Sequence, residues 1–170
     1  MIVSCHEIMP LIISALENGQ HVQMTANGGS MSPFIHDDDT VELEMNCSLP
    51  SKGDIVLVQC SKKRYVIHRI VKIKNGIFFL RGDAQVHCEG PFTVRNIMGK
   101  VVKSFHNGHT RIHNKGIWYY TGMIWIYTYN VVRYVKFVIC FHRIVASKLF
   151  RLITGTNFRA YIEKKRKIKS

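Results

Sequence analysis

Short runs of alternating apolar and polar residues, separated by glycine, proline and asparagine, fill the first two thirds of the chain. Alternation with a period of two is typical of strands with one buried face. It predicts strands over residues 21–25, 41–45, 54–59, 64–74, 77–80, 96–105 and 109–113. Asn75-Gly76 and Asn107-Gly108 are two-residue hairpin turns between strands, whereas residues 84–91 are expected to be irregular. The pattern therefore predicts a mainly β fold, a coiled antiparallel sheet or partial barrel.

One segment near the N-terminus departs from this alternation. Apolar residues recur at helical spacing between Glu7 and Glu17, and Asn18-Gly19 follows them as a helix stop. A short helix is therefore expected over about residues 7–18.

The composition changes again after Lys115. Residues 117–132 are apolar and rich in Trp and Tyr, but this run is shorter than the roughly 20 residues that span a bilayer. We therefore expect a β domain over residues 1–114 and an aromatic and basic helical tail over residues 115–170.

The formal net charge of +13 is concentrated in that tail. No Lys or Arg precedes Lys52, whereas residues 131–170 contain 11 Lys and Arg against the single acid Glu163. On a helical wheel, basic residues fall on one arc and apolar residues opposite. The basic arc holds Arg133, Lys136, Arg143, Lys148 and Arg151, and the apolar arc holds Val131, Val135, Val138, Val145, Leu149 and Leu152. This pattern predicts that residues 117–170 lie on an anionic membrane surface, and it leaves open a helix packed on the protein's own sheet.

Nucleic acid is not expected as a partner, because the predicted sheet lacks the stacking aromatics and the basic face of such modules. The five cysteines are odd in number and include no C-x-x-C pair, so they are interpreted as reduced thiols. No secretory signal is recognisable at the N-terminus, where Glu7 interrupts the apolar run. We therefore expect a peripheral membrane protein on the cytoplasmic side.

A loop over residues 28–34, Gly-Gly-Ser-Met-Ser-Pro-Phe, presents a serine between two predicted strands. Its glycines can adopt backbone angles that other residues adopt only with strain, and Pro33 prevents a helix directly after the loop. Two later segments follow, Tyr65-Val66-Ile67-His68-Arg69-Ile70 and Phe78-Phe79-Leu80-Arg81-Gly82-Asp83. In this order, from about residue 22 to 102, the motifs resemble the signal peptidase I and LexA-like serine peptidase superfamily. The resemblance implies the coiled β fold of that superfamily and peptide hydrolysis.

Amide hydrolysis needs an activated nucleophile, a base and donors for the oxyanion. The resemblance implies Ser30 as the nucleophile and His68 as the general base. An imidazole with a pKa near 6.5 can accept and return a proton close to neutral pH. Bacterial-type signal peptidases and the self-cleaving repressors have lysine at this position. The archaeal and endoplasmic-reticulum types have His-Arg, so His68-Arg69 makes this chain most similar to the His-type enzymes.

A carboxylate that orients the imidazole would complete the site, and two acids are candidates. Asp83 matches the family's Gly-Asp, and Glu89 stands where the His-type relatives have an aspartate. We expect Asp83 to organise its loop and Glu89 to contact the ring of His68, but either carboxylate could serve.

The expected oxyanion donor is the backbone N–H of Ser30, as the resemblance implies. Many relatives have a serine hydroxyl two residues earlier, where this chain has Gly28, so a second donor would have to come from backbone or water. Met31 and Phe34 are expected to line a shallow apolar cleft for the residues before the scissile bond.

No metal and no cofactor are expected. Asp37-Asp38-Asp39 forms an acidic turn, but three consecutive acids cannot all face one ion. His106, His109 and His113 flank a hairpin turn without an evident fourth ligand.

Three functions follow from these residues. The first is a signal peptidase-type endopeptidase acting on leader or precursor peptides with small residues before the cut, a preference that the resemblance implies. The second is a LexA-like regulator that cleaves itself, which the missing lysine and the lack of a helix-turn-helix segment disfavour. The third is a non-catalytic module that binds membranes through its tail.

Overall fold

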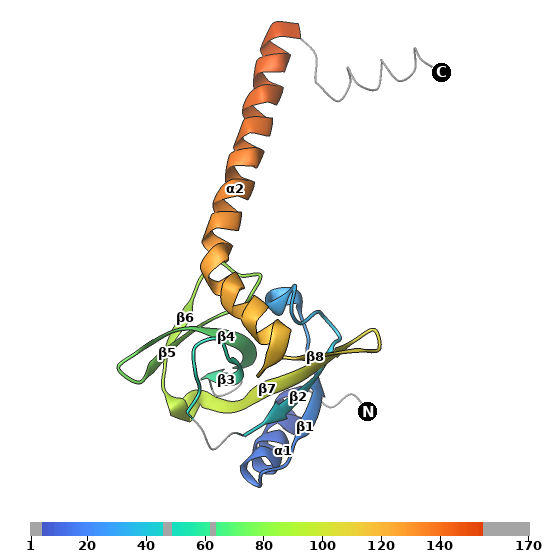
Figure 1. The fold of residues 1–170 in the computed structure, drawn as a ribbon, viewed down its shortest axis with the longest axis vertical. Helices are drawn as coiled ribbons and strands as arrows, with labels where there is room; N and C mark the ends of the chain where they lie inside the picture. The colour runs from blue at the N-terminus through green and yellow to red at the C-terminus, as the bar shows by residue number, and fades with distance from the viewer. Residues whose placement is uncertain (1–4, 46–48, 62–63, 155–170) are drawn as a thin grey trace. The chain divides into compact units, whose positions relative to one another are not determined.

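A computed structural model describes residues 5–45, 49–61 and 64–154 (Figure 1). The chain forms two compact units, Met1–Ile126 and Tyr127–Ser170. Among the described residues the strands belong to the first unit, and residues 127–154 of the second are helical.

The predicted N-terminal helix is α1 (Cys5–Glu17). Its apolar positions bury Met9 and Leu16 completely against the sheet. Gly19 follows with a φ of 74°, and its N–H donates to the Leu16 carbonyl at 2.9 Å. Glycine adopts this left-handed angle at low cost, which explains why the helix ends here.

Eight antiparallel strands form one sheet, as the alternation predicts. They are β1 (Val22–Thr25), β2 (Thr40–Glu44), β3 (Ile55–Ser61), β4 (Arg64–Lys74), β5 (Ile77–Arg81), β6 (Glu89–Phe92), β7 (Ile97–His106) and β8 (His109–Ile112). Their order is β1-β2-β7-β3-β4-β5-β6, and β8 pairs with β7. Within the described residues β1 and β6 do not pair, so the sheet is open and not a closed barrel. The prediction of a mainly β fold with a coiled antiparallel sheet is confirmed.

Both predicted hairpin turns are present. Asn75 and Gly76 have φ values of 52° and 73°, and Asn107 and Gly108 have values of 47° and 79°. Positive φ at both central residues matches the right-handed twist of the flanking strands. The first turn joins β4 to β5, and the second joins β7 to β8.

The expectation that residues 84–91 are irregular is wrong at its end, where Glu89–Phe92 forms β6. Gly90 and Pro91 suggested an irregular segment, because proline cannot donate to a strand ladder. In the described part of the chain β6 is the last strand of the sheet and pairs only with β5. An edge strand tolerates proline, since one of its sides has no neighbour.

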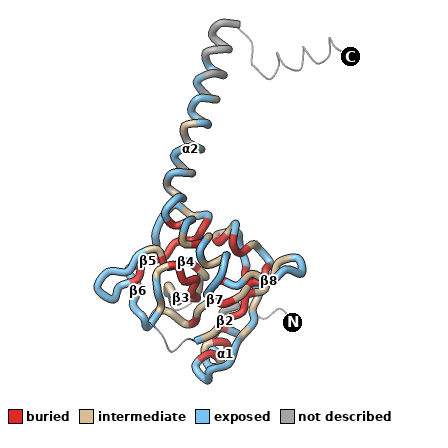
Figure 2. Tube along the Cα trace, in the orientation of Figure 1, coloured by how far each residue is buried: buried red, intermediate tan, exposed pale blue. Residues whose placement is uncertain are grey.

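Buried stretches of the chain lie largely within the sheet (Figure 2), and their apolar residues form two clusters. In β3, Ile55 and Leu57 belong to one cluster, and Val56 and Val58 belong to the other. A strand buried on both faces lies inside the curl of the sheet. α1 covers the first cluster, and β5 and β6 enclose the second.

Within the described residues the tail forms one helix, α2 (Gly116–Thr154). Its residues up to Ile126 belong to the first unit, where Sδ of Met123 occupies the space that a Cβ on Gly53 would need. No helix within the described residues is long and apolar enough to cross a membrane. Most side chains of the predicted basic arc lie outside the described part of the chain.

Candidate active site

Ser30 lies in a single 3-10 turn, η1 (Gly29–Met31), between β1 and β2. Gly28 begins this turn with a φ of 93°, which glycine adopts without strain. Its N–H donates to Oδ1 of Asp37 at 2.6 Å. The backbone around the half-buried Ser30 is therefore held in a defined position.

A second segment fixes the same loop from another direction. The N–H of Ala84 donates to the Ser30 carbonyl at 2.9 Å. A Cβ on Gly82 would lie 2.6 Å from that carbonyl oxygen, so only glycine permits this approach. The Gly-Asp turn that carries Asp83 is thereby packed against the backbone of Ser30.

His68 lies in β4, opposite Val56 of β3, and is only 2% exposed. Its Nδ1 is buried without a hydrogen-bond partner, and Oε2 of Glu89 lies 3.8 Å away. Burial lowers the pKa of His68 below its usual value of 6.5, although the Glu89 carboxylate raises it in part. The ring is therefore neutral at physiological pH, the form that accepts a proton.

Glu89, at the start of β6, is shared by three side chains. Its Oε1 accepts from Nη2 of Arg64 at 2.9 Å, and its Oε2 is 3.6 Å from Sγ of Cys60. Burial, with the Glu89 charge added, raises the pKa of Cys60, so this thiol stays protonated. Cys60 and Arg64 were not found by sequence reasoning, because β3, β4 and β6 are not all neighbours in the sheet, and only its curl brings these residues to Glu89.

Asp83 makes a different contact. Both of its carboxylate oxygens accept from Arg69, at 2.8 Å to Nε and 2.7 Å to Nη2. Arg69 is fully buried, and its Nη1 donates to the Gly53 carbonyl at 2.9 Å. Asp83 is therefore held by a buried bidentate ion pair with Arg69. Glu89 is the carboxylate that approaches His68, with its Oε2 3.8 Å from Nδ1 of the ring.

The first turns of α2 cover this ion pair. Nε1 of Trp125 donates to the Asp83 carbonyl at 2.9 Å, and the Trp125 ring meets Phe34 edge-on. Phe34 in turn lies under the guanidinium of Arg69, 4.7 Å from its ring centroid. A Cβ on Gly122 would be 2.5 Å from Nη1 of Arg69. The alternation of strands carries no information about this cover, and the sequence did not indicate it.

A cavity of about 160 Å³ opens beside Ser30. Gly28 and Met31 are among its lining residues, whereas Phe34 lies under Arg69. The walls come from α1, β1, the Ser30 loop, β3 and β4, namely Met9, Met24, Thr25, Ala26, Asn27, Gly28, Ser30, Met31, Ile35, Leu57, Tyr65, Val66 and Ile67. Strands β1 and β4 are not neighbours in the sheet, so the sheet coils around this cavity.

The structure places Ser30 and His68 on elements that contact each other, but His68 is not among the residues that line the cavity beside Ser30. η1 contacts β4, and Tyr65, Val66 and Ile67 line the cavity together with Ser30. In the part of the chain that the structure describes, the Ser30 hydroxyl makes no hydrogen bond to His68. Since Nδ1 faces Glu89, Nε2 is the ring nitrogen left for a nucleophile. Such contacts are often long before substrate binds.

Breaking the Arg69–Asp83 pair is expected to destabilise the fold strongly. Arg69→Met leaves the Asp83 carboxylate buried and uncompensated, which costs about 3–5 kcal/mol in the free energy of unfolding. Arg95→Met, an exposed arginine in η2 (Val94–Asn96), should change it by less than about 0.5 kcal/mol. Chemical denaturation of both variants measures the difference, and a cost near that of the control would show that the pair is dispensable.

Comparison with known families supports the resemblance found in the motifs. The family described as Peptidase S24-like matches residues 3–102, more than half of the 170 residues. No curated protein matches the chain. The matched range includes Ser30, His68, Asp83 and Glu89, and it ends within β7. The protein is therefore a member of the Peptidase S24-like family, the LexA and signal peptidase I superfamily.

Proposed function

We propose that the chain is a serine endopeptidase of the signal peptidase type that hydrolyses leader or precursor peptides. The observation that supports it best is the buried, neutral His68, whose Nδ1 faces Glu89 at 3.8 Å in a strand that contacts the Ser30 turn. A neutral imidazole beside a carboxylate is the base that a serine nucleophile needs.

In this mechanism the Ser30 hydroxyl oxygen attacks the scissile carbonyl while Nε2 of His68 takes its proton. Glu89 stabilises the imidazolium that results, and the backbone N–H of Ser30 donates to the oxyanion. The imidazolium then gives the proton to the leaving amine as the amide bond breaks. Water, deprotonated by the same imidazole, hydrolyses the acyl-enzyme and restores Ser30.

The cavity beside Ser30 is compatible with small or apolar side chains before the scissile bond. Met24, Met31, Ile35 and Leu57 contribute apolar walls, and Thr25 and Asn27 contribute polar ones. Charged side chains would lose their hydration in such a cavity without gaining a partner.

Replacing the nucleophile tests the proposal directly. Ser30→Ala should lower the rate of cleavage of a leader-peptide substrate by about 10⁴-fold or more, with the fold unchanged. Ser32→Ala, in the same loop, is the matched control and should retain the parental rate. Equal rates for Ser30→Ala and the parent would exclude this mechanism. Incubating the full chain alone distinguishes self-cleavage, whose rate per molecule would be independent of protein concentration.

The role of Glu89 has its own signature in the pH profile of kcat/KM. Activity should fall on the acid side as His68 gains a proton, with a midpoint below 6.5 because burial lowers its pKa. Glu89 raises that pKa, so Glu89→Gln should move the acid limb to lower pH. The exposed Glu17→Gln should leave it in place. An unmoved acid limb in Glu89→Gln would assign the orienting role elsewhere.

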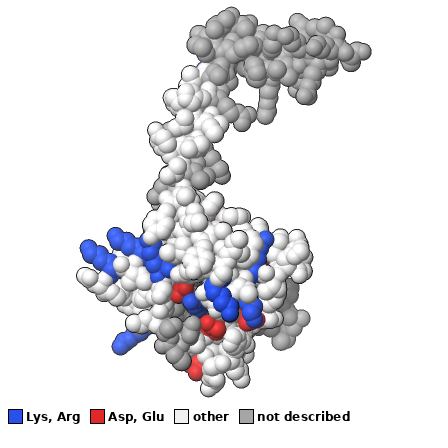
Figure 3. All heavy atoms as spheres, in the orientation of Figure 1, with Lys and Arg blue, Asp and Glu red and all other residues white. Residues whose placement is uncertain are grey.

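We also propose that the tail holds the protein on an anionic membrane surface. Exposed apolar residues recur along α2, mostly three or four positions apart. They are Ile117, Tyr120, Ile124, Tyr127, Val131, Tyr134, Val135, Ile139, Phe141 and Val145. In the view of Figure 3 most described side chains of α2 are uncharged, although Lys148 is described and basic. Residues 131–170 supply an excess of ten positive charges in the sequence. Apolar contact and anionic lipid reinforce each other in such a helix.

Vesicle binding by the full chain tests this proposal. The protein should sediment with vesicles containing anionic lipid, and less with neutral ones or at high salt. Tyr134→Glu with Phe141→Glu should abolish binding. Thr128→Glu with His142→Glu adds the same charge at exposed polar positions and should weaken it less. A chain that forms dimers in solution and ignores anionic vesicles would instead indicate that the apolar residues form a coiled coil.

A further inference from the structure

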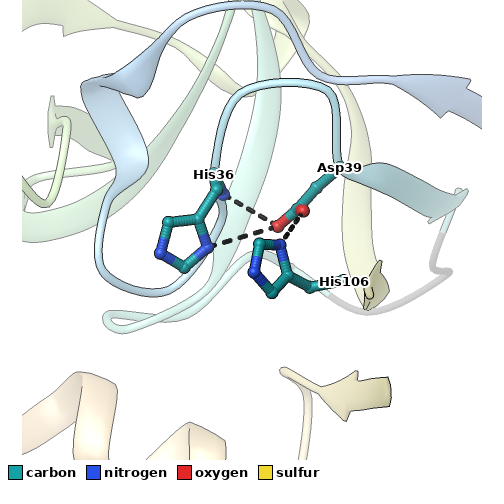
Figure 4. Close-up of side chains that lie close together, drawn as sticks. All are labelled: His36, Asp39 and His106. Atoms are coloured by element: carbon teal, nitrogen blue, oxygen red, sulfur yellow. Dashed lines mark hydrogen bonds and ion pairs between the residues drawn. The ribbon is translucent and has the colours of Figure 1, made fainter. Parts of the chain in front are cut away.

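Three potential metal ligands meet outside the Ser30–His68 site. His36 and Asp39 lie between the Ser30 turn and β2, and His106 is the last residue of β7 (Figure 4). One ligand atom from each lies within 4.8 Å of the other two. Sequence reasoning placed Asp39 in an acidic turn and His106 in a histidine-rich hairpin, expected no metal in either, and did not single out His36. The signal was missed because β2 and β7 pair only in the folded sheet.

The carboxylate of this cluster is the fixed member. Asp39 is 3% exposed, its Oδ2 accepts from the His36 backbone N–H at 2.8 Å, and its Oδ1 is 2.5 Å from Nδ1 of His106. The imidazoles are about one third exposed and stack with centroids 4.4 Å apart. A rigid buried acid with two adjustable rings at the surface is a geometry that can close around an ion.

The donor set fits a divalent transition metal. Two imidazoles and one carboxylate are ligands of Zn²⁺, whose bonds of about 2.1 Å keep two ligands within about 4.2 Å of each other. The three ligand atoms now lie within 4.8 Å of one another. The imidazoles would therefore have to move by about 1 Å to bind one ion, which partly exposed rings can do. Water would complete the coordination, as in sites with three protein ligands.

Charged groups near the cluster both favour and oppose the binding of a cation. Burial raises the pKa of Asp39, but the His36 backbone N–H and the His106 ring outweigh it and hold the pKa below the usual value. The carboxylate is thus ionised and available to a cation. The guanidinium of Arg111 opposes cation binding, because its Nη1 lies 3.4 Å from Nδ1 of His36. That guanidinium is also bound to the Phe34 carbonyl at 2.9 Å, which holds it to one side.

We propose that His36, Asp39 and His106 form a binding site for a divalent transition-metal ion of the Zn²⁺ class. The ion would join the turn after the Ser30 loop to the β7–β8 hairpin. The same turn already holds the chain before that loop, since Ala26 exchanges hydrogen bonds with Asp38 and Asp39 at 2.9 and 2.8 Å. Bound metal therefore braces the loop, and this inference does not depend on the peptidase mechanism.

Metal binding is measured on the full chain after treatment with a chelator. Titration with Co²⁺ should produce visible absorption at one ion per chain, Zn²⁺ should displace it, and Zn²⁺ should raise the Tm, because an ion that binds the folded state stabilises it. His36→Ala and His106→Ala, both at partly exposed positions, should each weaken binding by about tenfold or more. Asp39→Asn should do the same if it folds.

His109→Ala is the matched control, because His109 is exposed and pairs with His106 across the hairpin. It should bind Co²⁺ like the parent. Unchanged Co²⁺ affinity and unchanged Zn²⁺-dependent Tm in both His36→Ala and His106→Ala would overturn the site, as would a parent chain that binds no ion.

Discussion

Arg69 and Asp83 form the contact on which the surroundings of the candidate site depend. Two buried charges lose their hydration, and only good geometry and further hydrogen bonds compensate for that cost. The pair has both: two oxygens of Asp83 accept from one guanidinium, and Gly53 accepts its third donor. Because Phe34 and Trp125 also pack on the pair, it ties β4 to the Ser30 loop and to α2. The loop of the candidate nucleophile is thus positioned by a salt bridge that takes no part in the proposed chemistry.

Asp83 and Glu89 are two acids of one segment with different surroundings. Asp83 is 2% exposed and fully engaged by Arg69, whereas Glu89 is 25% exposed and shared by Arg64, Cys60 and the neighbourhood of His68. A carboxylate held by a bidentate partner cannot turn toward another donor. Glu89, whose Oε2 lies 3.8 Å from Nδ1 of His68, can still turn toward that ring. Environment, more than residue type, separates a structural acid from a candidate orienting acid.

Local chemistry explains which parts of the fold were predictable. Alternation and the Asn-Gly turns gave β4, both hairpins and the mainly β fold, because these depend on neighbours in the sequence. β6 was missed since proline is acceptable only at an edge, and edges are defined by sheet order. The meeting of His106 with His36 depends on pairing between distant strands. The motif order pointed to Ser30 and His68, but only the fold shows which groups surround them.

The contact of Gly122 with Arg69 reverses an ordinary rule of helix stability. Within a helix, alanine is favoured over glycine by about 1 kcal/mol, because glycine has more backbone freedom to lose. At this position a methyl group would meet the guanidinium and force it away from Asp83. Replacing Gly122 by alanine would therefore disturb the buried ion pair of Arg69 with Asp83. The space for a side chain in the first turns of α2 is therefore limited by the buried guanidinium of Arg69 on β4.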